Sequence, residues 1–448
     1  MADTVERLVV RLEDGRHRWR EVELRGSKLV QRAEVSSNDD ETDRETSTRF
    51  DSVKEAREEF EHLVARYVKN GLKEVSRETL TVPDDHVVEQ RITEHPAYER
   101  ACLGSAAVEP WRVYADWLQE HGDVRGELAS MFLNGRNADA WIFLARHRDL
   151  LLGEHGQSAL RVLEVTNGFI SALGLKSAYE SDVDLAELCA DVLGRPGARF
   201  VTRLRFGLAS FESDNDWTST LGAVLSSPVA ARVQRLEFDD YTYEDCEISW
   251  TPFGDFAALW EGAPGLEHLH LRSGAGGHLG TIAHATLKSF VRESGGLGGE
   301  EVDAIVTAKW PQLEHLEVWT GSSGYGGVAT TDQLGPILRG ERLPQLRSLG
   351  IVNTELSTEL LGELAASPLL PRLKALDLSK GVFTDAEVDG WLRLAPKFRH
   401  LARLDLSKNL LDERVGELKA ALPNAVLDDQ RDHEPDEDDD FRYVAVGE

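Results

Sequence analysis

One short phrase recurs along residues 170–406, and it constrains the fold of this chain more than any other feature. An apolar residue is followed by two variable residues and then by an apolar, a variable and an apolar residue. The phrase begins at Ile170, Val201, Val233, Leu266, Leu313, Leu346, Leu373 and Leu401. Successive starts are 31, 32, 33, 47, 33, 27 and 28 residues apart. A phrase that returns at this spacing indicates an array of similar units and not a single globular core.

Each unit is predicted to contain one short strand and one returning helix. The alternation at the end of the phrase suits a strand, and the intervening stretches 358–366 and 385–394 are predicted helices. One such unit cannot bury its apolar face alone, so the units must stack into a curved α/β solenoid. The last phrases, above all Leu404-Asp405-Leu406-Ser407-Lys408-Asn409, resemble the leucine-rich repeat. The resemblance implies a leucine-rich-repeat solenoid over residues 154–428.

The variable residues of the phrase define a candidate binding surface. Because side chains alternate along a strand, these residues should point outward from the concave sheet. Charged and aromatic side chains are concentrated in the middle units, at Arg235, Glu237, Asp239, His268, His270, Arg272, His315, Glu317 and Trp319. Arginine and aromatic side chains are common interface anchors. We therefore predict a patch that binds a protein partner, centred on Trp319 and His268.

Two features of this patch have alternative interpretations. Trp319 could instead pack beneath the glycine-rich loop Gly321–Gly327. The histidines could form a metal site, since residues two apart on a strand share a face. No nearby carboxylate in the sequence completes such a site, so ordinary surface histidines and no metal are expected.

The first 75 residues are predicted to form a small α+β domain. Short strands are expected at Leu8–Val10 and Val22–Leu24, and the polar stretch 36–48 is expected to be a surface loop. Ser52 with Glu55 has the spacing of a helix-capping box, and Asn70-Gly71 can end that helix.

This region resembles the WGR domain, through Trp19, Phe50-Asp51-Ser52 and Lys69-Asn70-Gly71-Leu72. The resemblance implies contact with nucleic acid, for which Trp19 and Arg32 are the candidate residues. However, the stretch that aligns with the family signature, 32–36, has Glu34 where the family has arginine. Residues 1–75 also hold 15 Lys and Arg against 18 Asp and Glu. Nucleic acid is therefore a disfavoured partner.

A helical segment is predicted over residues 96–153, after a linker at 76–95. Its main feature is Glu109–Leu128, where Pro110 suits a first helical turn and Gly122-Asp123 can end one helix and cap the next. This stretch resembles the repeat-companion domain of bacterial multidomain proteins, and the resemblance implies a helical cap before the repeats. Two interpretations would explain Tyr114, Asp116, Asp123 and Arg125: a functional site, or simple capping with an ion pair. We favour capping with an ion pair.

The remaining loops and the C-terminal stretch show no ligand motif. The runs Gly274–Gly277 and Gly295–Gly299 fit no phosphate-binding pattern, so they are interpreted as flexible loops. Residues 429–448 are predicted to be a solvated acidic tail.

Composition narrows the function. A formal net charge of −29 favours protein partners over nucleic acid and anionic membranes. The N-terminus has no leader pattern, no long apolar run exists, and Cys102, Cys189 and Cys246 form no paired motif, so a cytoplasmic protein is expected. No catalytic motif is present either. We therefore predict a non-enzymatic protein-interaction scaffold or sensor without cofactor, with a nucleic-acid-binding adaptor as the alternative.

Overall fold

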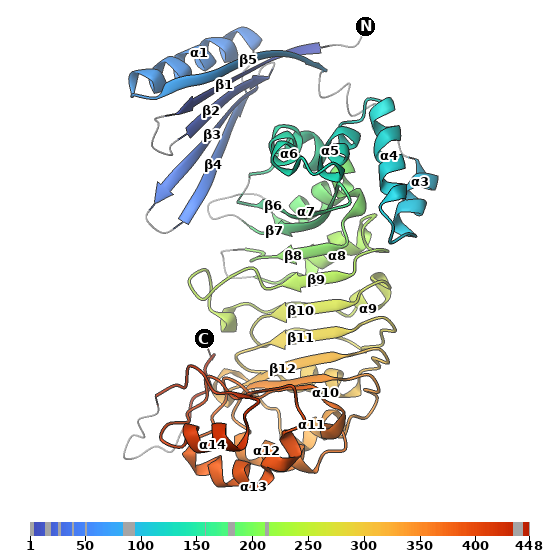
Figure 1. The fold of residues 1–448 in the computed structure, drawn as a ribbon, viewed down its shortest axis with the longest axis vertical. Coiled ribbons are helices and arrows are strands. Elements are labelled where there is room, and N and C mark those ends of the chain that lie inside the picture. Colours follow the sequence, from blue (N-terminus) through green and yellow to red (C-terminus); the bar gives the residue numbers. More distant parts are fainter. Residues whose placement is uncertain are drawn as a thin grey trace. The chain divides into compact units, whose positions relative to one another are not determined.

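The structure is a computed structural model with two compact units. It describes residues 4–13, 19–25, 28–37, 40–49, 52–83, 95–156, 158–177, 184–210, 215–432 and 442–447. The first unit is Met1–Ile170 with Arg195–Gly197, and the second is Ser171–Gly194 with Ala198–Glu448. Figure 1 shows the elements of both.

An antiparallel sheet and one helix form the beginning of the first unit. The elements are β1 (Thr4–Glu13), β2 (Trp19–Arg25), β3 (Lys28–Ser37), β4 (Asp40–Arg49), α1 (Val53–Lys69) and β5 (Lys73–Pro83), with the strand order β4-β3-β2-β1-β5. The helix begins as predicted, because Ser52 Oγ accepts the N–H of Glu55 at 3.2 Å. It ends at Asn70, where Gly71 takes a φ of +97°. Its buried face, including Phe60 and Leu63, packs on the apolar side of the sheet.

Two predictions for this region are wrong, and both concern polar strands. The predicted surface loop 36–48 lies largely within β4, which pairs with β3 over its whole length. Residues 76–83 of the predicted linker continue β5, which pairs with β1; residues 84–94 lie outside the described residues. The side chains of 73–79 are exposed, so backbone pairing and not burial holds this edge strand. Such a strand leaves no apolar alternation in the sequence.

Four helices follow in the first unit, α3 (Pro96–Leu103), α4 (Glu109–Glu120), α5 (Val124–Leu133) and α6 (Asn137–Leu152), and then β6 (Leu160–Thr166). Asp123 caps α5 by accepting the N–H of Arg125 at 2.9 Å. The two side chains also form a 2.6 Å ion pair and are only 0% and 5% exposed. Tyr114 is buried and donates to Glu99, whereas Asp116 is exposed. Capping and an ion pair thus account for Asp123 and Arg125, as favoured above.

The second unit is dominated by a long, open, parallel sheet. Its strands are β7 (Phe169–Leu175), β8 (Arg203–Phe206), β9 (Arg235–Phe238), β10 (His268–Arg272), β11 (Ser289–Glu293), β12 (His315–Gly321), β13 (Ser348–Thr354), β14 (Ala375–Asp377), β15 (Arg403–Asp405) and β16 (Ala425–Val426). They follow one another in chain order, as Figure 1 shows for β8–β12. Each predicted phrase includes one of these strands. The sheet is open and not closed into a barrel, because in the strand order β16 is an end strand that pairs with β15 alone.

Helices and short 3₁₀ turns connect the strands. The helices are α7 (Leu185–Gly194), α8 (Thr218–Ser226), α9 (Leu259–Gly262), α10 (Gly299–Thr307), α11 (Thr331–Leu338), α12 (Ser357–Ala366), α13 (Val388–Phe398) and α14 (Val415–Ala421). The 3₁₀ turns are Pro196–Phe200, Ile248–Trp250, Ser323–Tyr325, Leu370–Arg372 and Asp385–Glu387. The mixed α/β class and the solenoid-like arrangement agree with the prediction.

The core of this unit consists of rows of side chains that run across the strands. In one row, residues paired from strand to strand are Leu173, Leu204, Leu236, Leu269, Phe290, Leu316, Leu349, Leu376 and Leu404. All of them are at most 1% exposed. A parallel row includes Phe206 and Phe238, whose rings stack with centroids 4.8 Å apart. Each strand therefore buries its apolar residues against those of its neighbours and against side chains of the connecting segments, such as Trp217 and Phe256 around Phe238.

The strand β11 was not predicted, and it explains the single gap of 47 residues. It would continue the phrase as Leu287-x-x-Phe290-x-Arg292, with arginine where the third apolar residue stands elsewhere. Arg292 lies in the second core row, paired with Leu271 and Val318, and is 0% exposed. A search for three apolar residues cannot detect this strand.

The glycines after β11 are packed tightly, contrary to the predicted flexible loop. Gly321 has a φ of +68°, and a Cβ there would lie 1.9 Å from the carbonyl oxygen of Gly295. Gly296 and Gly321 form a β-bridge. These glycines are needed because two backbone segments approach too closely for any side chain.

The prediction of a solvated C-terminal tail is wrong for Arg442–Gly447, which folds onto the second unit. Val444 is 7% exposed and packs with Val382 and Leu410. Residues 433–441 lie outside the described residues. The sequence did not predict this contact because the docked segment is short and follows a strongly acidic run.

Candidate functional site

The face of the parallel sheet opposite the core rows carries the predicted binding residues. We call this surface the polar face, defined by Arg203, Arg205, Arg235, Glu237, Asp239, His268, His270, Arg272, Glu293, His315 and Glu317. All of these residues are partly exposed, whereas the residues between them are buried. The alternation predicted from the sequence is therefore present on β8, β9, β10 and β12.

Ion pairs link the polar face diagonally from β8 to β9. Arg203 is paired with Arg235 in the sheet, yet its Nε donates to Glu237, two residues further along, at 2.7 Å. Arg205 likewise reaches Asp239 at 2.8 Å, beyond its direct neighbour Glu237. The diagonal geometry places each cation beside a carboxylate, and it directs Arg203 away from the arginine opposite it.

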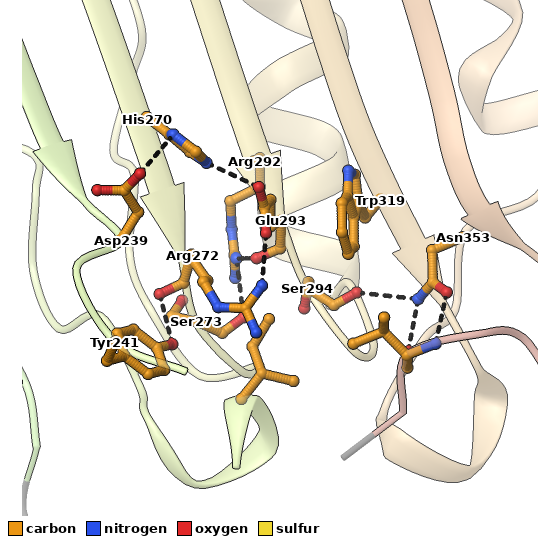
Figure 2. Close-up of polar contacts among 12 residues, drawn as sticks. Asp239, Tyr241, His270, Arg272, Ser273, Arg292, Glu293, Ser294, Trp319 and Asn353 are labelled. Carbon is orange, nitrogen blue, oxygen red and sulfur yellow. Dashed lines mark hydrogen bonds and ion pairs between the residues drawn. The ribbon is translucent and has the colours of Figure 1, made fainter. Parts of the chain in front are cut away.

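His270 is the centre of this network and bridges three strands (Figure 2). Its Nδ1 lies 3.2 Å from Asp239 on one side, and its Nε2 lies 2.9 Å from Glu293 on the other. Burial opposes the charge of His270, but the hydrogen bonds to the two carboxylates outweigh it and raise the pKa to about 9. Burial also opposes the charge of Asp239, yet hydrogen bonds from His270 and Arg205 lower the pKa of Asp239 to about 2. At neutral pH this is a fully ionised array.

Glu293 was missed by the sequence prediction and is a central member of the network. Besides His270, it pairs with Arg272, whose Nη1 lies 2.7 Å from its Oε2. The Arg272 guanidinium also lies over the ring of Tyr241, 5.4 Å from the centroid. Tyr241 is 5% exposed and donates its hydroxyl to the carbonyl of Arg272 at 2.8 Å. Glu293 directly follows Arg292 in the chain. Because Arg292 breaks the apolar pattern, the sequence predicted neither the strand β11 nor the place of Glu293 on it.

Trp319 is buried, so the predicted exposed anchor is not present. Its side chain is 4% exposed, and its indole N–H donates to Glu317 at 2.7 Å. The ammonium of Lys380 covers the ring at 3.8 Å from the centroid. Burial lowers the pKa of Lys380. Alternation along β12 predicts an exposed Trp319, but the side chain is buried because Lys380, from two strands further along, covers it.

The three histidines do not assemble into a metal site. His268 and His315 occupy the same row, but Ser289 of β11 lies between them. Both ring nitrogens of His270 already face carboxylates. Burial lowers the pKa of His268 and of His315, so both favour the neutral form. Among the described residues, no cluster of His, Cys, Asp and Glu could hold a metal ion.

The candidate nucleic-acid residues lie in the first unit, in adjacent strands of the antiparallel sheet. Trp19 is the first residue of β2, and its side chain lies outside the described part of the chain. The Arg32 guanidinium lies 3.0 Å from Glu21 and 2.8 Å from Glu23 and is 11% exposed. Two carboxylates therefore surround the cation that would have to reach a phosphate.

The cysteines offer little nucleophilic chemistry. Burial raises the pKa of the Cys102 thiol, with a contribution from Glu99, to about 11. Burial alone raises the pKa of Cys189 to about 12. Cys246 is partly exposed, and burial and two neighbouring acids raise its pKa as well. Thiols with raised pKa values are poor nucleophiles at neutral pH.

Comparisons with known proteins identify a similar fold. No protein-family model matches the chain, and no curated protein is significantly similar to it. The crystal structure of a structural genomics target from Bacteroides fragilis has a TM-score of 0.53 to this chain at 20% identity, and the match covers 96% of this chain and 97% of that one. At this identity the likeness concerns the fold alone. In the described part of the chain, no helix combines the length and apolarity needed to cross a bilayer.

Proposed function

We propose that this chain is a non-enzymatic leucine-rich-repeat scaffold that binds a protein partner on its polar face. The observation that carries the proposal is the network around His270, which fixes charged side chains of four adjacent strands in one arrangement. Side chains that are already ordered lose little conformational entropy on binding. A surface of this kind suits recognition of a folded protein with complementary charges.

The repeat assignment is supported by a recurring backbone feature. Asn353, Lys380 and Lys408 each follow the paired leucine of their strand by four residues, and their φ values are +51°, +62° and +55°. Asn409, the asparagine expected in the last phrase, is 0% exposed and donates to the carbonyls of Leu378 and Leu406. We also assign the N-terminal domain as WGR-like and residues 96–153 as a repeat-companion cap, on the resemblances described above.

Partner binding is expected to begin at the arginines of β8 and β9. The side chains of Arg203, Arg205 and Arg235 are 34%, 34% and 39% exposed, more than the other ion-paired residues of the network. Guanidinium groups keep spare donors after pairing with one carboxylate. An acidic or carbonyl-rich partner surface could use these donors without disrupting the existing ion pairs.

The test uses the full chain as bait for host proteins, with nuclease present. The variant Arg235→Ala, His268→Ala removes two exposed groups and leaves the pairs of His270 in place. A control variant, His62→Ala, Arg339→Ala, changes the same residue types at exposed positions outside the polar face. A protein held by the native chain and the control at equal affinity, but at least about tenfold more weakly by the first variant, supports the proposal. Equal binding by all three chains contradicts it.

The alternative of a nucleic-acid-binding adaptor has weaker support, since the paired guanidinium of Arg32 leaves little free positive charge. It predicts binding of DNA or RNA with a steep dependence on salt. Binding that is present without nuclease, lost when nuclease is added and lost in Arg32→Ala would favour this alternative over the scaffold.

A further inference from the structure

The segment Arg442–Gly447 crosses the turns that follow β11 to β15, and its contacts resemble those of a bound peptide. We call the surface beneath it the seat, defined by Gly295, Tyr325, Asn353, Lys380, Val382, Glu387, Leu410 and Arg431. The N–H of Ala445 donates to the carbonyl of Lys380 at 3.0 Å. The carbonyl of Tyr443 accepts from Arg431 at 2.9 Å. The seat therefore holds the segment largely through its backbone.

Asn353 makes the most specific of these contacts (Figure 2). Its Oδ1 accepts the N–H of Val446 at 2.9 Å, and its Nδ2 donates to the carbonyl of the same residue at 2.5 Å. The same Nδ2 lies 3.4 Å from the carbonyl of Ser294. One buried amide thus contacts both backbone polar groups of one residue, Val446, which requires an extended segment but no particular side chain at that position.

Side-chain selectivity is limited to three positions of the segment. Arg442 pairs with Glu387 at 3.1 Å, and Val444 fills the space between Val382 and Leu410. Gly447 is needed for fit, because a Cβ there would lie 2.5 Å from the ring of Tyr325. The seat therefore selects a basic residue, an aliphatic residue two positions later, and a glycine three positions after that.

We propose that the seat is a binding site for an extended segment of a partner protein with this pattern, and that Arg442–Gly447 occupies it in cis. Only Val444 of the segment is buried, and the other five residues are partly or well exposed. A partner segment with the same pattern could make every contact that the cis segment makes. This inference is independent of the proposal for the polar face.

The cis segment should compete strongly with any partner. It is joined to the seat through Asp432, ten positions before Arg442 in the sequence. A short tether gives an effective concentration in the millimolar range, so a cis segment of micromolar intrinsic affinity makes a partner segment bind the intact chain about 1,000-fold more weakly than an empty seat. Release of the cis segment is thus the step that controls access.

The experiment measures binding of a fluorescein-labelled, end-capped peptide with the sequence of residues 442–447 to the full chain. Val446→Pro removes the N–H that Asn353 accepts and should release the cis segment, whereas Val446→Ala keeps that N–H and is the matched control. We expect the peptide to bind Val446→Pro at least about tenfold more tightly than the native chain or Val446→Ala. A peptide carrying Gly447→Val should not bind.

Two further variants make the result decisive. Asn353→Asp places a carboxylate against the carbonyls of Val446 and Ser294, so adding it to Val446→Pro should abolish peptide binding, and a thermal melt checks that the double variant is folded. Val444→Asp is a second release variant in case Val446→Pro does not fold. The proposal is overturned if neither release variant binds the peptide, or if the native chain binds it equally well.

Discussion

Replacement of the buried Arg292 tests the description of the solenoid core most directly. Its side chain is 0% exposed, and its Nε donates to Glu301 at 2.7 Å. It also donates to the carbonyls of Ser273 at 3.0 Å and Gly274 at 2.8 Å. In Arg292→Ala the carboxylate of Glu301, 3% exposed, loses its cation. Breaking a buried pair in this way costs about 3–5 kcal/mol of unfolding free energy.

A double variant separates the charge from the packing. In Arg292→Met, Glu301→Leu no charge is buried. The carbonyl of Ser273 loses the Arg292 donor, and the carbonyl of Gly274 keeps only the hydroxyl of Ser273, at 3.2 Å. We expect a cost of about 1–3 kcal/mol, smaller than that of the single variant.

Urea unfolding followed by tryptophan fluorescence measures both values, and hydrogen exchange across β10–β12 tests whether the loss is local. Urea is preferred because it adds no salt to screen the ion pair. A cost below about 1 kcal/mol for Arg292→Ala, or equal costs for the two variants, would refute the reasoning.

Three further predictions follow from the polar face and its surroundings. Because the folded pKa of His270, about 9, exceeds its unfolded value of 6.5, its contribution to stability is complete below about pH 6.5 and is lost as the pH rises through 9. The stability difference between the native chain and His270→Gln, measured in urea, should therefore shrink by about 2–3 kcal/mol between pH 6 and pH 10, and a constant difference would contradict the network. Trp319→Ala should lower the unfolding free energy by about 3–5 kcal/mol, with Trp319→Phe costing much less; a neutral effect in thermal unfolding would mean that the indole is not packed. Gly321→Ala should be more destabilising than Gly222→Ala, a helical position with open space around it, and similar melting temperatures would show that the close approach to Gly295 is absent.

The sequence was most informative where burial alone decides the structure. Every phrase with three apolar residues marks a strand, because an inward row of apolar side chains must continue across the sheet. The phrase fails at β11, where Arg292 satisfies its polar atoms inside the core through Glu301 and backbone carbonyls. The apolar pattern also does not predict an edge strand such as β5, for the opposite reason: backbone pairing holds this strand without burial of its side chains.

The candidate site was predictable in its position but not in its pairing. Alternation correctly placed Arg235, Glu237, Asp239, His268 and His270 on one face. It could not show that His270 lies between two carboxylates, because Glu293 belongs to the undetected strand. It also could not show the burial of Trp319, which depends on Lys380 from a strand two positions away.

The seat also has a consequence for how the end of the array unfolds. When each turn contacts only its neighbours, unfolding can begin at the last turn and proceed inward one turn at a time. Arg442–Gly447 contacts turns from Gly295 to Leu410, so it adds a long-range term that couples these turns into one cooperative block. Displacing the segment would remove this coupling between the turns, and occupation of the seat by a partner would restore it. Binding at the seat would thereby set the local stability, and not merely the accessibility, of the last turns of the solenoid.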